Sequence, residues 1–146
     1  MAARFGRATI DGVTLVAATP TTILQLVAAA NHAIRLTKLK IGFHGIVNTN
    51  EPVLVELVRQ TTAGTMTGLT PVKSDDSIAD TLDTTAQHTA TVEPTEGDIL
   101  DQFPVHPQTG IVEPIEDIVI GAADRVGVRV TAPNGVDVDC TVCFEE

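Results

Sequence analysis

Two runs of alternating apolar residues, one on each side of an Asn-Gly turn, are the most restrictive feature of this sequence. Every second residue is apolar in residues 125–132, and the same period of two resumes in residues 136–144, after Pro133-Asn134-Gly135. Side chains point to alternate faces along a β-strand, so this period predicts two strands that each bury one face. Asn-Gly is a favoured turn between antiparallel strands. The sequence therefore predicts a β-hairpin with one buried face near the C-terminus.

Shorter runs with the same alternation occur along most of the chain and are separated by Pro and Gly. The apolar positions between residues 22 and 34 also fit a helical period, which leaves a helix as the alternative there. Residues 74–85 carry four aspartates and few apolar residues, so an exposed acidic loop is expected. Many short strands with turn residues between them are typical of an antiparallel β-sandwich or jelly roll. The expected strands cover residues 9–16, 22–28, 33–43, 53–57, 65–72, 88–94, 99–106 and 110–120.

The length of 146 residues suits a single all-β domain with a short N-terminal arm. We assign residues 1–19 to the arm and a first strand, and residues 20–146 to a jelly-roll β-sandwich domain, with Pro20 at the division. No run of about 18 apolar residues occurs, so no membrane-spanning helix is expected. The first residues lack the apolar stretch of a secretory signal.

The net charge of −10 is unevenly distributed. Residues 1–46 hold five basic residues and one acid, whereas residues 47–146 hold four basic residues and eighteen acids. An acidic surface repels phosphate backbones, which argues against nucleic acid as a partner. Trp and Tyr are absent, although glycan-binding and single-strand-binding surfaces usually stack their ligands on aromatic rings. The basic N-terminal part suits docking on a neighbouring acidic surface.

Cys140-Thr141-Val142-Cys143 matches the C-x-x-C spacing of redox and zinc motifs. The motif lies inside an alternating strand, where residues three apart point to opposite faces. The two sulfur atoms would therefore not meet in a disulfide or share one metal ion. We expect Cys140 to be a core residue.

Other patterns for catalysis or metal binding are weak. The chain has no His-x-His pair of the kind found in metal-dependent cupins, although ligands distant in sequence can still converge in space. His106 lies in a turn-like stretch and is expected to form hydrogen bonds there. No Gly-x-Ser-x-Gly nucleophile motif occurs. We therefore expect no catalytic residue, no cofactor and no metal site. The four histidines are His32, His44, His88 and His106.

Four short segments resemble small jelly-roll structural proteins of tailed bacteriophages. They are Phe43-His44-Gly45, Pro52-Val53-Leu54-Val55-Glu56-Leu57, Val105-His106-Pro107-Gln108 and Gly127-Val128-Arg129-Val130-Thr131-Ala132-Pro133. The resemblance lies in the general character of these segments and in the order of the strands over residues 20–146. It implies a jelly roll of the tumour-necrosis-factor type. That group includes capsid decoration, or cement, proteins, which commonly sit as trimers on the phage head. The group offers no catalytic residues to carry over.

We therefore predict a non-enzymatic virion structural protein that decorates or cements a bacteriophage capsid through homo-oligomeric jelly-roll contacts. Its expected partners are further copies of itself, in a homotrimer, and the major capsid protein or another virion protein. Neither nucleic acid nor a membrane is an expected partner. The protein would be made in the host cytoplasm and reside on the capsid exterior. Arg4, Phe5 and Arg7 of the basic N-terminal arm are the candidate partner-binding residues.

Two other classes of function are kept as alternatives. The first is a phage head-fibre, tail or receptor- or glycan-binding module, which the lack of Trp and Tyr disfavours. The second is a small metalloenzyme on a cupin-like barrel, which stoichiometric transition metal in the purified protein would favour.

Overall fold

The regular elements of this chain are β-strands throughout the part that the structure describes. A computed structural model describes residues 3–45 and 51–146. The segment for which the sequence also allows a helix, residues 22–34, contains no helix: most of it lies in the strand Thr21–Val27, and the next strand begins at Ile34. No helix among the described residues is long and apolar enough to cross a membrane. The all-β prediction is therefore confirmed.

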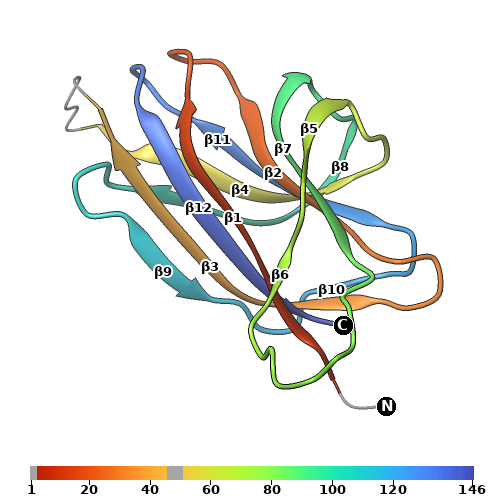
Figure 1. Cartoon of the computed structure of the whole chain (residues 1–146). Coiled ribbons are helices and arrows are strands. Elements are labelled where there is room, and N and C mark those ends of the chain that lie inside the picture. Colours follow the sequence, from red (N-terminus) through yellow and green to blue (C-terminus); the bar gives the residue numbers. More distant parts are fainter. Residues whose placement is uncertain (1–2, 46–50) are drawn as a thin grey trace.

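Within the described residues, twelve strands form two antiparallel six-stranded sheets, named sheet A and sheet B here (Figure 1). Sheet A contains β1 (Phe5–Thr14), β3 (Ile34–His44), β6 (Val72–Lys73), β9 (Ile111–Pro114), β10 (Val119–Ile120) and β12 (Asp137–Glu145). Sheet B contains β2 (Thr21–Val27), β4 (Val53–Gln60), β5 (Thr65–Leu69), β7 (Thr85–Val92), β8 (Glu96–Val105) and β11 (Arg125–Thr131). Strands β4 and β2 of sheet B have the most buried residues, while β12, in the middle of sheet A, alternates buried residues with partly exposed ones.

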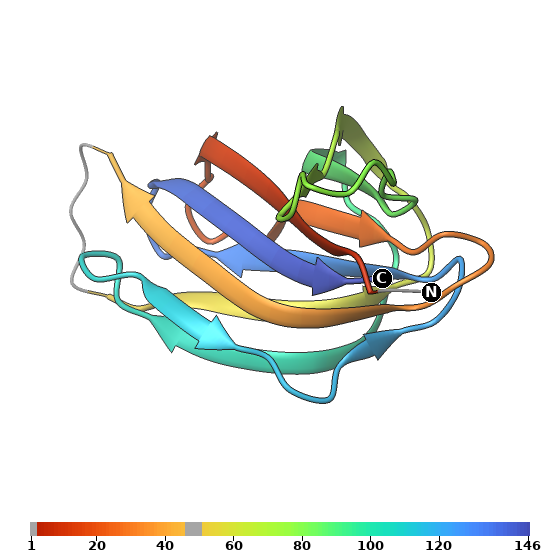
Figure 2. The same ribbon diagram turned by 60° about the horizontal axis from the view of Figure 1, so that its bottom comes forward.

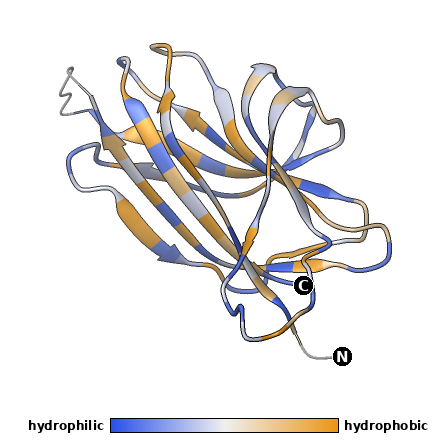
Figure 3. Ribbon diagram, viewed as in Figure 1, coloured by the Kyte–Doolittle hydropathy of each residue, from blue (hydrophilic) through white to orange (hydrophobic). Residues whose placement is uncertain are grey.

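The two sheets share one hydrophobic core, which is the arrangement of a β-sandwich (Figures 1 and 2). Apolar and polar residues alternate along β12 and β3, as Figure 3 shows. Leu36 and Val142 of sheet A face Leu24 and Leu57 of sheet B across the core. Phe144 is the largest side chain that is fully buried.

The predicted C-terminal hairpin is wrong, although both of its strands exist. Strand β11 pairs with β2 and β4, whereas β12 pairs with β1 and β3 in the other sheet. At Pro133-Asn134-Gly135 the chain crosses from sheet B to sheet A. The carbonyl groups of Ala132 and Val136 accept hydrogen bonds from the amides of Ala18 and Leu15. Apolar and polar residues alternate along both β11 and β12 because each strand packs one face against the same core, from opposite sheets. The alternation alone therefore does not distinguish a crossing between sheets from a hairpin.

Strands far apart in the sequence pair in nested order. Strand β1 pairs with β12, β2 with β11, β3 with β9 and β10, and β4 with β8. The chain between β4 and β8 adds strands at the outside of this arrangement, with β6 next to β1 and β7 next to β2. The first and last strands therefore lie side by side in the middle of sheet A.

The chain between β5 and β7 also departs from the predicted strands. Residues 65–72, predicted as one strand, divide at Thr70-Pro71 into β5 of sheet B and β6 of sheet A. Proline has no amide hydrogen to donate, which favours a break in the strand at this point. Residues 74–84 contain no strand and are mostly exposed, so the predicted acidic loop is confirmed.

A largely buried arginine joins three strands of sheet B. Arg129 on β11 donates from Nε and Nη2 to the two carboxylate oxygens of Glu56 on β4, at 3.2 and 3.0 Å. Its Nη1 contacts the carboxylate of Glu96 on β8. Glu56 is only 5% exposed, so its charge depends on Arg129 for compensation.

Candidate partner-binding surface

The residues predicted as an N-terminal arm are part of sheet A. Residues 5–14 form β1, which lies between β12 and β6 (Figure 1). Met1 and Ala2 of the predicted arm lie outside the described residues. Strand β1 alternates between buried residues and exposed ones, and Phe5, Arg7 and Thr9 lie on the outer face of the sheet. Removing this segment would expose the edge of β12, so point substitutions are the suitable test of its function.

Arg4 is engaged within the chain. Its amide and carbonyl exchange hydrogen bonds with those of Glu146, both at 2.9 Å. The guanidinium lies 2.8 Å from a carboxylate oxygen of Asp83 and 3.1 Å from one of Glu146, and it also donates to the carbonyl of Thr81. The hydrogen bond to Asp83 raises the pKa of Arg4. Arg4 therefore holds the acidic loop against the end of β12.

Phe5 and Arg7 are available at the surface, beside two other exposed apolar side chains. Phe5 is 48% exposed, Val72 67% and Ile78 42%. Val72 is the cross-strand neighbour of Arg7, while Phe5 and Ile78 line the same small hollow. Arg7 donates from Nε to Ser74 Oγ at 3.1 Å. We name these four residues, Phe5, Arg7, Val72 and Ile78, the N-terminal patch. Exposed apolar patches with charged neighbours are typical of interaction sites.

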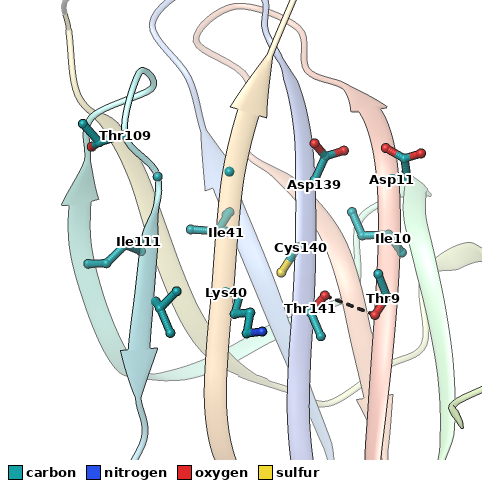
Figure 4. A pocket seen from close by; sticks show the side chains of 13 residues that line it. Thr9, Ile10, Asp11, Lys40, Ile41, Thr109, Ile111, Asp139, Cys140 and Thr141 are labelled. Atoms are coloured by element: carbon teal, nitrogen blue, oxygen red, sulfur yellow. Dashed lines mark hydrogen bonds between the residues drawn. The ribbon is translucent and has the colours of Figure 1, made fainter.

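A second candidate site is a shallow hollow of about 700 Å³ on the outer face of sheet A (Figure 4). Asp11 and Asp139 lie at one end of it, with Lys40 and the hydrogen-bonded pair Thr9 and Thr141 further along. The other lining residues are Ile10, Ile41, Gly42, Thr109, Gly110, Ile111, Val112 and Cys140. The hollow thus presents carboxylates, hydroxyl groups and an ammonium group to solvent.

The two aspartates of this hollow differ in acidity. The hydrogen bond to Asp139 raises the pKa of Asp11, and the negative charge of Asp139 adds to that effect. Partial burial acts to raise the pKa of Asp139, but hydrogen bonds from the Gly12 amide, Asp11 and the His44 ring lower it overall. The Gly12 amide lies 2.7 Å and the His44 ring nitrogen 2.9 Å from its carboxylate. Asp11 is therefore the weaker acid of the two.

A third group brings together residues that no sequence motif connects. His32, Asp83 and Glu146 each offer a ligand atom, and these atoms lie within 4.8 Å of one another. Burial acts to raise the pKa of Glu146. The hydrogen bond from the Thr84 hydroxyl group, those from the amides of Asp83 and Thr84, and the positive charge of Arg4 outweigh burial and lower the pKa overall. His32 lies in the loop between β2 and β3, Asp83 in the acidic loop, and Glu146 directly after β12. Because the three residues are far apart in the sequence, their spacing matches no metal-binding motif.

The two cysteines lie on opposite faces of β12, as predicted. Cys140 is in the core, where burial raises the pKa of its thiol, and Cys143 is half-buried on the outer face. We expect a thiol reagent at neutral pH to label Cys143 in the folded protein and Cys140 only after denaturation, because the buried thiol neither ionises nor meets the reagent. Mass spectrometry of labelled peptides measures this. Rapid labelling of both thiols, or an internal disulfide, would contradict the structure.

His106 has the hydrogen-bonding role in a turn that the sequence predicts. Its Nδ1 accepts from the amide of Gln108 at 3.2 Å, and its carbonyl accepts from the amides of Thr109 and Gly110. This histidine therefore shapes the turn between β8 and β9.

The sequence matches no protein-family model, and no curated protein is significantly similar to it. The function of the chain therefore has to be inferred from its fold and its surface.

Proposed function

We propose that this chain is a non-enzymatic structural protein of a tailed-bacteriophage particle, located on the capsid exterior. The nested pairing of the strands supports a jelly roll, because a jelly roll is a long hairpin rolled up so that its first strand pairs with its last. The orders β1-β12-β3-β9 and β2-β11-β4-β8 correspond to the two sheets of such a roll. Jelly rolls are common in viral capsid proteins.

The observation that carries the proposal is the N-terminal patch. Phe5, Val72 and Ile78 expose apolar surface beside the cation of Arg7, on a chain whose overall charge is strongly negative. This combination suits a permanent contact with another protein, where the apolar groups are buried and Arg7 meets an acidic group. We propose the major capsid protein, or another virion protein, as the partner at this patch, with further copies of the chain completing a trimer.

Substitution of the patch tests the proposed partner contact. We expect the double variant Phe5→Ser, Val72→Ser to lose most of its binding to virus particles in co-sedimentation, because two apolar anchors are removed. The matched control is Val16→Ser, since Val16 is 66% exposed, close to the 67% of Val72, but lies outside the patch. Particle binding that is unchanged in the double variant would reject the patch as the contact.

The mass of the purified protein tests the proposed trimer. Size-exclusion chromatography with light scattering is expected to give three times the 15.3 kDa of one chain. A mass of one chain at all concentrations would reject the homotrimer in solution. Particles that never contain the protein, by mass spectrometry or immunogold labelling, would reject the virion location.

The hollow on sheet A favours a second candidate, a receptor- or glycan-binding module. Thr9, Thr141 and Lys40 offer hydrogen-bond donors, while Asp139 offers an acceptor, and sugar hydroxyl groups require both. A glycan array tests this function directly. Specific hits that disappear in Lys40→Ala would support it, and an array without hits would reject it.

A further inference from the structure

We propose that His32, Asp83 and Glu146 form a zinc-binding site that ties the acidic loop to the sandwich. The site is independent of the proposed function in the virion. It joins three segments of the chain: the loop between β2 and β3, residues 74–84, and the end of β12. One histidine and two carboxylates are a mixed nitrogen and oxygen ligand set, which suits Zn²⁺ better than Ca²⁺ or Mg²⁺.

The distances suit a bound ion. His32 Nε2 lies 3.6 Å from Glu146 Oε2, and all three ligand atoms lie within 4.8 Å of one another. Zinc binds imidazole nitrogen and carboxylate oxygen at about 2.0–2.2 Å. The angle at an ion bound to Nε2 and Oε2 at those distances would be roughly 110–130°. His32 and Glu146 therefore need little movement to bind one zinc ion together.

His32 supplies a second and independent indication of a ligand. Its Nε2 atom is buried and has no hydrogen-bond partner among the described residues. Buried polar atoms without a partner are rare in folded proteins, because each one costs the free energy of its lost contact with water. At 3.6 Å, Glu146 Oε2 is too far away to be that partner. A metal ion between the two atoms would give His32 Nε2 the partner that it lacks.

The surroundings hold the two carboxylates in place. Arg4 contacts Oε1 of Glu146, whereas His32 faces Oε2. The guanidinium and a bound ion would therefore contact different oxygens of the Glu146 carboxylate. The amide and the hydroxyl group of Thr84 both donate to Oε2 and fix the side chain, which is fully buried. Such outer contacts to ligating groups are usual in metal sites.

The charge and access of the site also permit a dication. Arg4 neutralises one of the two carboxylates, so Asp83, Glu146 and Arg4 together retain one negative charge. The side chain of Asp83 is half exposed, which gives the ion a path from solvent. Solvent on this side leaves room for water as a fourth ligand, as in zinc sites with three protein ligands.

Calorimetric titration of the full chain, stripped of metal, with ZnCl₂ tests the site. We expect saturable binding of one ion per chain and a higher midpoint of thermal unfolding with zinc than without. His32→Gln should weaken the affinity more than about tenfold, since the loss of even an outer contact costs that much in known sites. His106→Gln is the matched control and should bind as the unchanged chain does, because His106 lies in a different turn.

A measurement on the unchanged chain avoids any dependence on folding of the variant. Zinc should shift the ring resonances of His32 in a histidine-selective NMR spectrum and leave those of His106 in place. The proposal is overturned by the absence of zinc binding, by equal affinity in His32→Gln, or by zinc-induced shifts confined to other histidines. Mg²⁺ at the same concentration should give neither heat nor shift, and binding of both ions alike would also overturn it.

Discussion

Replacing Phe144 with alanine is expected to destabilise the protein by about 3–5 kcal/mol, the usual cost of a buried phenylalanine. Phe144 is fully buried on the inner face of β12. Its ring fills the space opposite Gly6 on β1, where an added Cβ atom would lie 2.6 Å from the ring. Because glycine offers no side chain to move into the space, the cavity would stay open. Urea unfolding followed by circular dichroism measures the free energy of unfolding.

Phe5 gives a matched control for this experiment, since it lies one residue before Gly6 on the outer face of the same strand. It is about half exposed, so Phe5→Ala should cost less than about 1 kcal/mol. Equal losses of stability in the two variants would mean that Phe144 does not lie in the core as described.

Removing the guanidinium of Arg129 is expected to cost about 3–5 kcal/mol, because a buried charge loses its partner. In Arg129→Ala the nearly buried carboxylate of Glu56 would lose both hydrogen bonds from the guanidinium. Glu96 would lose the same partner but is exposed enough to be hydrated. The free energy of unfolding at neutral pH measures the effect.

A double variant separates the cost of an unpaired charge from the loss of packing. Glu56→Leu with Arg129→Met replaces the buried ion pair with apolar side chains of similar volume, which is often neutral for stability. The double variant should therefore be more stable than Arg129→Ala. If it is less stable than Arg129→Ala, the ion pair contributes favourably beyond charge compensation, and the explanation given for Arg129→Ala is wrong.

Local patterns predicted the strands much better than their partners. Along β12 the alternation from Val138 to Phe144 follows directly from which side chains face the core, so the sequence alone predicts this strand and its buried face. The pairing depends on residues at the other end of the chain. Nothing in the turn at Asn134-Gly135 indicates that Leu15 and Ala18 would take its carbonyl hydrogen bonds. A preference for a hairpin is therefore outweighed by tertiary contacts that leave no local signal.

The candidate sites show the same division between local and distant information. The basic N-terminal arm predicts Arg4, Phe5 and Arg7 as partner-binding residues. Phe5 and Arg7 are accessible on the outer face of sheet A, whereas Arg4 is engaged within the chain. The position of Arg4 against Glu146 depends on the pairing of the first and last strands, which the sequence did not predict. His32 and Asp83 are brought to Glu146 by other pairings between distant strands, β3 with β12 and β7 with β2, so a motif search finds none of the three.

The pairing of β1 with β12 also limits when this protein can fold. Phe5 lies opposite Glu145, so sheet A is incomplete until the ribosome has released nearly all of the described chain. Contacts between residues so distant in sequence form slowly, because a long loop must close before any of them is made. The apolar strands β2 and β3 emerge early and stay unpaired until their partner strands follow, and aggregation is a risk at that stage. We therefore expect sheet A to be completed only after β12 has left the ribosome, and the yield of native protein to fall when synthesis is faster or the temperature is higher.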